Sequence, residues 1–374
     1  MTSPVSRRGI LGLGLGFGGL LVGAALAGGC EEEPSKVQDR GEVLASLVDR
    51  VILPMLAALR EQSEALAGAL DAFAAGPTAA ALGASRERWS GARTAYRRTL
   101  AFGIGPADDI AITGGILDEP TDPEKLAKLV ATSPPPDLTV VQSSPASARG
   151  FLAIEALLFE VGAEDAALVA RFTDPAEGPG RRAALAALGQ DLRGKLVAVA
   201  EAWSVGGFGE QFRRAGNGSA VFRAQRDAFD VVLNQTLVVA DRTLDILRKS
   251  SGITADDPAT PVADRSDRTL LDLVDDLVGI EALYTGTWEG QGGPSIRAIV
   301  AEANAGADGA LQKALAGALQ ALASFTPPLR HSFLARPAEA EALLAKLQPV
   351  RRTLATEIFN VLGVSVGISD KDGD

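Results

Sequence analysis

The segment GEVLASLVDRVILPMLAALREQSEALAGALDAFAAG, residues 41–76, decides the fold class. Its apolar side chains recur three and four residues apart, which is the spacing of one face of a helix. They are Val43, Leu44, Leu47, Val48, Val51, Ile52, Met55, Leu56, Leu59, Leu66 and Leu70. Pro54 interrupts the pattern, so we expect a kink or a break there and an end at Gly76-Pro77.

The rest of the chain continues in the same way. We expect further helices near residues 78–102, 145–161, 181–203, 222–247, 270–284, 295–325 and 337–362. No segment alternates polar and apolar residues as a half-buried strand does. Hydrophobic residues make up 47% of the chain but aromatic residues only 5%, which is typical of helices packed through Ala and Leu. The sequence therefore predicts an all-α protein of two packed helical bundles, 41–205 and 221–365.

Residues 103–147 are rich in Gly and Pro and contain Pro134-Pro135-Pro136. We expect a long ordered loop there with one short helix near residues 123–131, and loops of this length are usually functional. The Gly-rich segments 206–209 and 286–293 lack the strand and the Lys-Ser/Thr of a phosphate-binding loop, so we interpret them as connectors.

An internal echo suggests duplication. Residues 150–159, GFLAIEALLF, and residues 278–284, VGIEALY, share the core Ile-Glu-Ala-Leu and lie at equivalent places in the two halves. Ala/Glu/Leu helices coincide easily, so the echo is a hint that the two bundles are related by a pseudo-repeat.

The N-terminus has the pattern of an export signal. Arg7 and Arg8 precede an apolar, Gly-rich stretch that ends in Leu26-Ala27-Gly28-Gly29-Cys30. This order of basic, apolar and small residues is typical of a secretory signal, here of twin-arginine type over residues 1–29. The stretch is also long enough to span a bilayer, so a retained transmembrane anchor is the alternative.

Cys30 is the only cysteine, so no disulfide forms within the chain. Its place directly after the apolar stretch resembles a bacterial lipobox and predicts a lipidated N-terminus. Residues 31–40 would then be a polar tether, and residues 366–374 an acidic tail. We expect an exported protein, lipid-anchored to membrane through Cys30 and facing the periplasm.

Charge and histidine content exclude several classes of function. The formal net charge of −11 argues against nucleic-acid binding. His331 is the only histidine and follows a Pro-rich connector, which favours a surface position. Zinc peptidases usually need three protein ligands, often with two histidines, and Ser–His or Cys–His nucleophile pairs also need histidine. We therefore assign no catalytic residue.

Four motifs, in this order and spacing, resemble one family. They are WSGARTAY (89–96) with Ala101-Phe102-Gly103, RGFLAIEALLF (149–159), Tyr284-Thr285-Gly286 before Gly293-Pro294-Ser295-Ile296, and the C-terminal LGVSV (362–366) with DKDGD (370–374). Over residues 40–374 the chain is similar to the imelysin-like family of insulin-cleaving membrane peptidases and iron-uptake-associated envelope proteins. The resemblance implies a cell-envelope protein of two helical bundles.

The resemblance also implies a metal site, because the family signature Gly-x-His-x-x-Glu is thought to bind a metal. His and Glu three residues apart lie on one helix face and can share an ion. Here Gly150 and Glu155 match the signature, but Leu152 occupies the histidine position. Peptidase activity is therefore not expected from the signature.

An oxygen-only cation site is the metal site that these residues could still form. Glu155 and its counterpart Glu281 are candidate ligands, and Asp108 and Asp109 (with Asp118 and Glu119) could complete the site from the long loop. Iron or another divalent or trivalent cation would suit such ligands, although no cofactor is assigned. The alternatives are a Glu155 on the helix surface or paired with Arg93 or Arg149, and loop carboxylates that only cap helices. We interpret Trp89, Tyr96 and Trp203 as packing residues.

The sequence thus favours a non-catalytic envelope lipoprotein that binds a ligand, a metal or a partner, with envelope iron-uptake proteins as the expected partners. A divergent metallopeptidase that uses Glu155 is one alternative. A structural or interaction module without metal is another.

Overall fold

The N-terminal helical segment departs from regular α-helix just before Pro54. The computed structural model describes residues 39–117, 121–204, 206–251, 263, 265–325, 337–365 and 367. Helix α1 (Arg40–Leu47) begins at the N-cap Asp39 and passes through a π-helical turn, η1 (Val48–Ile52), into α2 (Leu53–Ala75). Pro54 lies in the first turn of α2, directly after the π-helical turn, where the regular i→i−4 hydrogen-bond pattern is already interrupted. The predicted interruption at Pro54 is therefore confirmed.

The next long helix agrees with its prediction, and the segment after it does not. Helix α3 (Ala79–Thr99) is capped by Thr78 and ends in the 3₁₀ turn η2 (Leu100–Phe102). The expected long loop with one short helix contains α4 (Pro106–Gly114), α5 (Pro123–Val130), α6 (Leu138–Ser143) and the 3₁₀ turn η3 (Ala146–Ala148). The short helix predicted near residues 123–131 is confirmed as α5. Pro106, which suggested a loop, begins α4, because proline fits the first turn of a helix.

Three further helices complete the first half. They are α7 (Gly150–Leu158), α8 (Asp165–Thr173) and α9 (Gly178–Ala202). The predictions near 145–161 and 181–203 are confirmed as α7 and α9, whereas α8 was not predicted. In the predicted Gly-rich turn after Trp203, the short helix α10 (Phe208–Arg213) begins.

The second half is also helical. Its helices are α11 (Gln225–Ser251), α12 (Thr269–Thr285), α13 (Ile296–Ala303), α14 (Ala305–Ser324), α16 (Pro337–Thr353), the π-helical turn η4 (Leu354–Ile358) and α17 (Phe359–Leu362). The helix expected over 295–325 is broken at Asn304, whose side chain accepts from the N–H of Ala307 and so caps α14.

A small hairpin corrects the expectation that the chain has no strand. Strands β1 (Thr287–Trp288) and β2 (Gln291–Gly292) pair antiparallel inside the Gly-rich connector. Glu289 and Gly290 form the turn with φ angles of 48° and 76°. Two residues with positive φ are what a tight two-residue hairpin needs.

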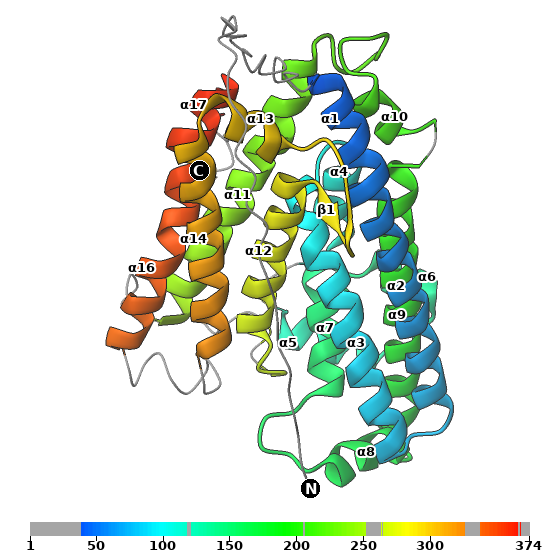
Figure 1. Ribbon diagram of the computed structural model, residues 1–374. Helices are drawn as coiled ribbons and strands as arrows, with labels where there is room; N and C mark the ends of the chain where they lie inside the picture. Colours follow the sequence, from blue (N-terminus) through cyan, green and yellow to red (C-terminus); the bar gives the residue numbers. More distant parts are fainter. Residues whose placement is uncertain are drawn as a thin grey trace, which may run out of the picture. The chain divides into compact units, whose positions relative to one another are not determined.

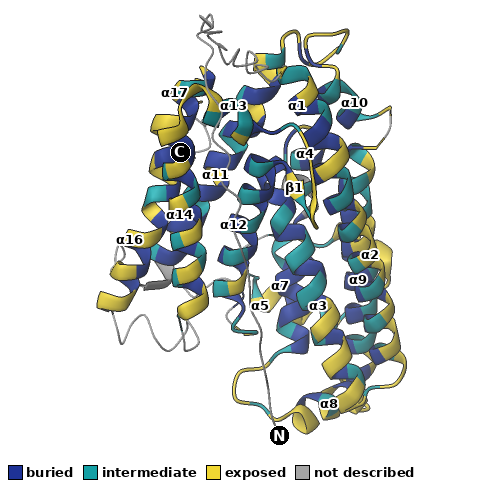
Figure 2. Cartoon of the chain, in the orientation of Figure 1, coloured by how far each residue is buried: buried dark blue, intermediate teal, exposed yellow. Residues whose placement is uncertain are grey.

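The helices pack in layers around a continuous apolar core (Figure 1). Helix α2 packs against both α3 and α9, while α16 packs against α11 and α14. Helix α12 contacts α3, so it joins elements from the two halves of the sequence. Figure 2 shows that buried residues line the inward faces of these helices and that exposed residues lie on their outer faces.

The predicted all-α helical-bundle fold is confirmed. All described residues belong to one compact unit, and the division into bundles 41–205 and 221–365 stays a prediction. No helix in the described ranges is long and apolar enough to cross a membrane. The predicted signal at Arg7 and Arg8, Cys30, most of the tether, Asp118, Glu119, His331 and most of the tail lie outside the described residues.

Candidate functional site

Helix α7 carries the signature segment, and backbone atoms closely surround its first residue, Gly150. Gly150 has φ of +74°, and a Cβ there would lie 2.2 Å from the carbonyl oxygen of Gly115 and 2.5 Å from that of Ile116. Phe151 N–H donates to this same Ile116 carbonyl at 3.2 Å. Only glycine permits such a close approach with this φ. The glycine of the signature is therefore explained by packing of α7 on the chain after α4.

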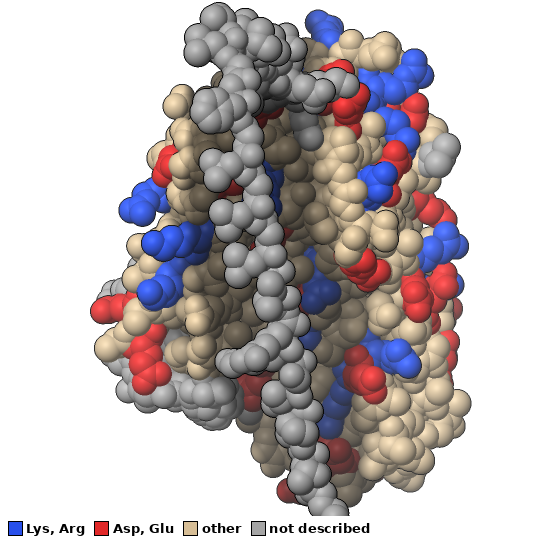
Figure 3. Space-filling view, viewed as in Figure 1, with Lys and Arg blue, Asp and Glu red and all other residues tan. Residues whose placement is uncertain are grey.

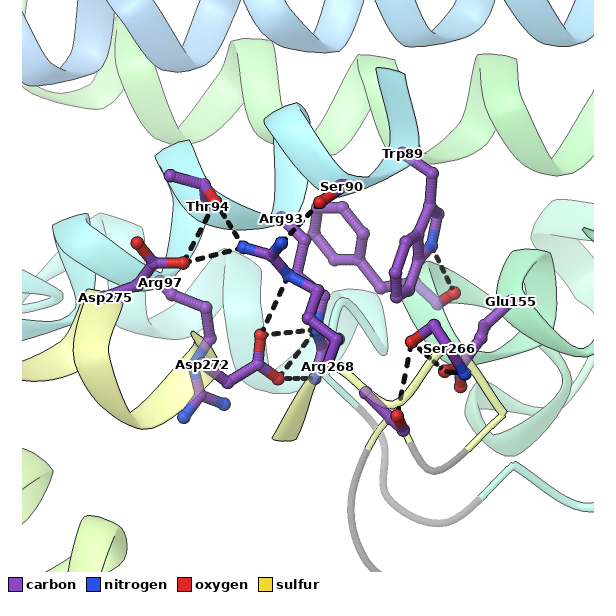
Figure 4. Close-up of polar contacts among 12 residues, drawn as sticks. Trp89, Ser90, Arg93, Thr94, Arg97, Glu155, Ser266, Arg268, Asp272 and Asp275 are labelled. Atoms are coloured by element: carbon purple, nitrogen blue, oxygen red, sulfur yellow. Dashed lines mark hydrogen bonds and ion pairs between the residues drawn. The ribbon is translucent and has the colours of Figure 1, made fainter. Parts of the chain in front are cut away.

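Glu155 lies on the buried face of α7, with 3% of its surface exposed. Its Oε1 accepts two hydrogen bonds from Ser266, at 2.9 Å from the backbone N–H and 2.5 Å from the hydroxyl (Figure 4). The Ser266 hydroxyl is also 3.2 Å from the carbonyl oxygen of Ala263. Glu155 thus fixes the short segment that leads into α12.

The pKa of Glu155 is raised above its ordinary value of 4.5. Burial is the largest cause, because it disfavours the charged carboxylate. The hydrogen bonds from Ser266 and the positive charge of Arg93 oppose the rise without cancelling it. Arg93, which the sequence offered as a partner, therefore acts on Glu155 through its charge, while Arg149 donates instead to the carbonyl oxygen of Gln142 at 3.2 Å.

The residues at the signature do not fit the metal that the family resemblance implies. Leu152 has no ligand atom, is 6% exposed and belongs to the apolar core. Oε1 of Glu155 already accepts two hydrogen bonds from Ser266, so at most the other carboxylate oxygen is left for a cation. The described residues hold no group of three or more His, Cys, Asp or Glu side chains placed to bind a metal ion.

The other candidate ligands have separate positions. Asp108 and Asp109 lie in the first turn of α4, where the helix dipole favours carboxylates. Glu281 is half-buried on α12, so it differs in burial from its counterpart Glu155. A role for any of these residues in ligand binding stays a prediction.

A buried ion-pair network joins α3 to α12, close to Glu155 (Figure 4). Arg93 Nη2 lies 2.6 Å from Asp272 Oδ2, and its Nε lies 2.9 Å from the same oxygen. Arg268 Nε lies 3.2 Å from Asp272 Oδ1, so one carboxylate serves two guanidinium groups. Arg93 and Asp272 are 0% and 1% exposed. Burial alone would raise the pKa of Asp272, but Arg93, Arg97 and Arg268 outweigh it and hold that pKa below its ordinary value.

Asp275 extends the network toward the surface. Its Oδ2 lies 2.7 Å from Arg268 Nη2 and accepts from the Thr94 hydroxyl at 3.0 Å. Its Oδ1 accepts from Arg98 Nε at 3.0 Å. Arg268 also donates to the hydroxyls of Ser90 and Thr94. These contacts align the polar face of α12 with α3 over two helical turns.

Asp276 forms the deepest pair, with Arg97, and both side chains are fully buried. Burial raises the pKa of Asp276 to about 6, although the charges of Arg97 and Arg242 lower it. The Thr243 hydroxyl on α11 lies 3.5 Å from Asp276 Oδ2. The network therefore reaches three helices: α3, α11 and α12.

Aromatic residues connect the network with the signature helix. The indole N–H of Trp89 donates to the carbonyl oxygen of Phe151 at 2.9 Å. The Arg93 guanidinium lies 5.7 Å from the ring centres of both Trp89 and Phe151. The prediction that Trp89 is a packing residue is confirmed, and Trp89 also positions α7.

None of these ion pairs was predicted from the sequence. Arg93 was named only as a possible partner of Glu155. The stronger indication was the helical spacing of Trp89, Arg93, Tyr96 and Arg97, which puts two arginines on the same stripe as two aromatic residues. Arginines on a core stripe require buried carboxylates opposite them.

The fold and the site define an all-α helical-bundle protein whose signature helix is packed against a buried arginine–aspartate network. The chain belongs to the imelysin family, whose sequence profile matches residues 52–356. The family resemblance seen in the sequence is thereby confirmed.

One relative is similar in sequence over part of its length. The chain is 32% identical to iron-regulated protein A of Synechococcus elongatus over 156 residues, which is 42% of this chain and 40% of that protein. The chain thus matches less than half of the length of this relative.

Two solved structures resemble the fold. One, described as an iron-regulated protein A precursor from Parabacteroides distasonis, has a TM-score of 0.72 at 20% identity and covers 88% of this chain and 96% of that one. The other, an imelysin-like protein from Psychrobacter arcticum, has a TM-score of 0.71 at 16% identity with the same coverages.

Proposed function

We propose that this chain is a non-catalytic binding protein of the bacterial cell envelope that serves iron acquisition. One observation carries the proposal: the signature helix has Leu152 at the histidine position, and Glu155 binds Ser266. The surviving signature residues therefore stabilise the fold between α7 and α12. Because the signature residues serve packing, we assign them no catalytic role. We therefore infer that the chain uses the family fold for binding.

The link to iron rests on sequence and structural similarity to named proteins. Iron-regulated protein A is the name of the matched relative from Synechococcus elongatus, and it also describes one of the structural neighbours. From this name we infer that the present chain also serves iron acquisition. We expect envelope iron-uptake proteins to be its partners.

Attachment to the membrane through a lipidated Cys30 completes the proposal. Acidic and basic side chains are interspersed over α2 and α3 on the face shown in Figure 3, which is typical of a solvated surface. A lipid tether would hold such a body at the membrane without inserting it.

An iron-uptake experiment tests the role directly. Deletion of the gene should lower uptake of radioactive iron by iron-starved cells, and the full chain should restore it. Glu155→Gln, which keeps an acceptor for Ser266, should restore uptake as well as the wild type. Unchanged uptake in the deletion strain would contradict the iron role.

A peptidase assay tests the non-catalytic part separately. The purified full chain should leave an unfolded protein substrate uncleaved in the presence of zinc or iron. Cleavage that a chelator and Glu155→Ala both abolish would instead support a divergent metallopeptidase. Radiolabelled palmitate tests the anchor: the wild type should incorporate it, and Cys30→Ser should not.

A further inference from the structure

A cavity of about 340 Å³ lies where η2, α4, α9 and α11 meet beside α3. This volume is in the range of sites that bind small organic molecules. Its walls are mainly apolar, and Thr99, Asp108, Gln235 and Arg242 add polar groups. The signature residues Gly150 and Glu155 do not line it, so it is a separate site.

Hydrogen bonds to the backbone hold two of the polar side chains in the cavity wall, Gln235 and Thr99, in place. The Gln235 amide donates to the carbonyl oxygen of Leu100 at 3.0 Å, and the Thr99 hydroxyl donates to that of Tyr96 at 2.7 Å. Phe102 packs edge-on against Trp203 with ring centres 6.0 Å apart. These parts of the wall are therefore already fixed in position, which lowers the entropy lost when a ligand binds.

Trp203 supplies a buried donor in the wall of this cavity. The residue is 1% exposed, and its indole N–H has no acceptor among the described residues. Trp89, which is equally buried, donates to a backbone carbonyl oxygen. A buried donor without an acceptor costs about 1–3 kcal/mol, so a ligand that offers an acceptor to Trp203 would recover this energy.

Arg242 gives the cavity a positive charge. It lies on α11 in the cavity wall and is close enough to Asp276 for its charge to lower the pKa of that carboxyl. A guanidinium carries five donors, so it can bind a ligand carboxylate in addition to its contacts within the protein. The negative charge of Asp108 is partly offset because Asp108 lies in the first turn of α4.

We propose that this cavity binds a small organic acid, a monocarboxylate with an apolar body. The carboxylate would accept from the indole N–H of Trp203 and pair with Arg242. The apolar body would pack against Leu56, Leu100 and Val199. The proposal is independent of the role in iron acquisition.

Calorimetry on the full chain with three probes that share one naphthalene ring tests the proposal. The probes are 2-naphthoate, its neutral amide 2-naphthamide, and the cationic 2-naphthylmethylammonium. We expect one molecule of 2-naphthoate to bind per chain, and the other two at least about 10-fold more weakly, because a charge-assisted hydrogen bond is worth about 1.5–3 kcal/mol. Equal binding of the amide or the cation, or no binding of 2-naphthoate, would overturn the proposal.

Variants place the ligand in the cavity. Arg242→Gln should weaken 2-naphthoate binding about 10-fold or more, and Trp203→Phe, which keeps the ring but removes the donor, about 2- to 10-fold. Trp288→Phe and Arg351→Gln are matched controls outside the cavity and should bind as the wild type does. Ala111→Leu fills the cavity from α4 without changing either donor, and it should abolish binding. This variant keeps the test valid if Trp203→Phe does not fold. Wild-type affinity in Ala111→Leu would place the ligand elsewhere.

Discussion

Glu155 is a buried carboxyl group that stabilises the fold in its protonated form. Ser266 and Arg93 favour the charged form, yet burial outweighs them and raises the pKa. The folded protein therefore binds this proton more tightly than the unfolded chain does. Stability from this group is complete below the ordinary pKa of 4.5 and is lost as pH rises through the raised value.

Glu155→Gln should remove this pH dependence. The glutamine keeps an acceptor for Ser266 but cannot ionise. We expect the melting temperature of the wild type to fall relative to that of the variant as pH rises above 4.5. Thermal melts between pH 4 and pH 7 check this, with the exposed Glu61→Gln as control. A constant difference between the wild type and Glu155→Gln across that range would contradict the assignment.

The close packing around Gly150 makes a side chain there costly. Gly150→Ala puts a Cβ 2.2 Å from the Gly115 carbonyl oxygen at a φ of +74°, so the free energy of unfolding should fall by about 2 kcal/mol or more. Gly83→Ala is the matched control, because Gly83 lies in α3 with no atom within 4 Å of the added Cβ. That substitution should raise stability by about 0.5–1 kcal/mol. Urea denaturation measures both, and equal effects would exclude the steric explanation.

At the scale of elements, the α3–α12 contact depends on charges that have been removed from water. Asp272→Asn leaves Arg93 and Arg268 buried with one anion fewer, which should cost about 3–5 kcal/mol. The exposed pair of Arg351 with Asp241, at 2.8 Å, is the comparison, and Asp241→Asn should cost less than about 1 kcal/mol. Urea denaturation of both variants checks the difference. A loss below about 1 kcal/mol in Asp272→Asn would mean that the network contributes little.

Most helices could be predicted from the sequence because their signals are local. The apolar spacing from Val43 to Leu70 and the proline at Pro54 gave α1, η1 and α2 within a few residues. The short helices α4 and α6 were missed because Gly and Pro indicate turns and first helical turns alike. Asn304 was overlooked as a cap because apolar residues recur with helical spacing on both sides of it.

The site was less predictable because its contacts are distant in sequence. Glu155 was identified from a local motif, but its partner Ser266 lies 111 positions away. Arg93 and Asp272 are separated by 179 positions. No local pattern pairs such residues. Arginines on an apolar stripe show that carboxylates must lie opposite, but only the tertiary structure identifies which.

The buried network joins segments from the two predicted bundles. Arg93, Arg97 and Arg98 lie on α3 in the first, and Asp272, Asp275 and Asp276 on α12 in the second. If one bundle unfolded while the other stayed folded, the charges left on the folded bundle would lose their partners while still partly buried, which is unfavourable. The network should therefore make the two halves unfold together.

Coincident unfolding transitions test this coupling. In the wild type, urea transitions followed by tryptophan fluorescence and by far-ultraviolet circular dichroism should superimpose, as expected for a single cooperative unit. The triple variant Asp272→Asn, Asp275→Asn and Asp276→Asn removes all three anions, so Arg93, Arg97 and Arg98 lose their counter-charges and the contact weakens. Its two transitions should separate, and amides of α14 and α9 should then exchange with different protection. Asp241→Asn should leave the transitions superimposed. Coupling through the network is excluded if the triple variant unfolds in one transition, or if the wild type already unfolds in two.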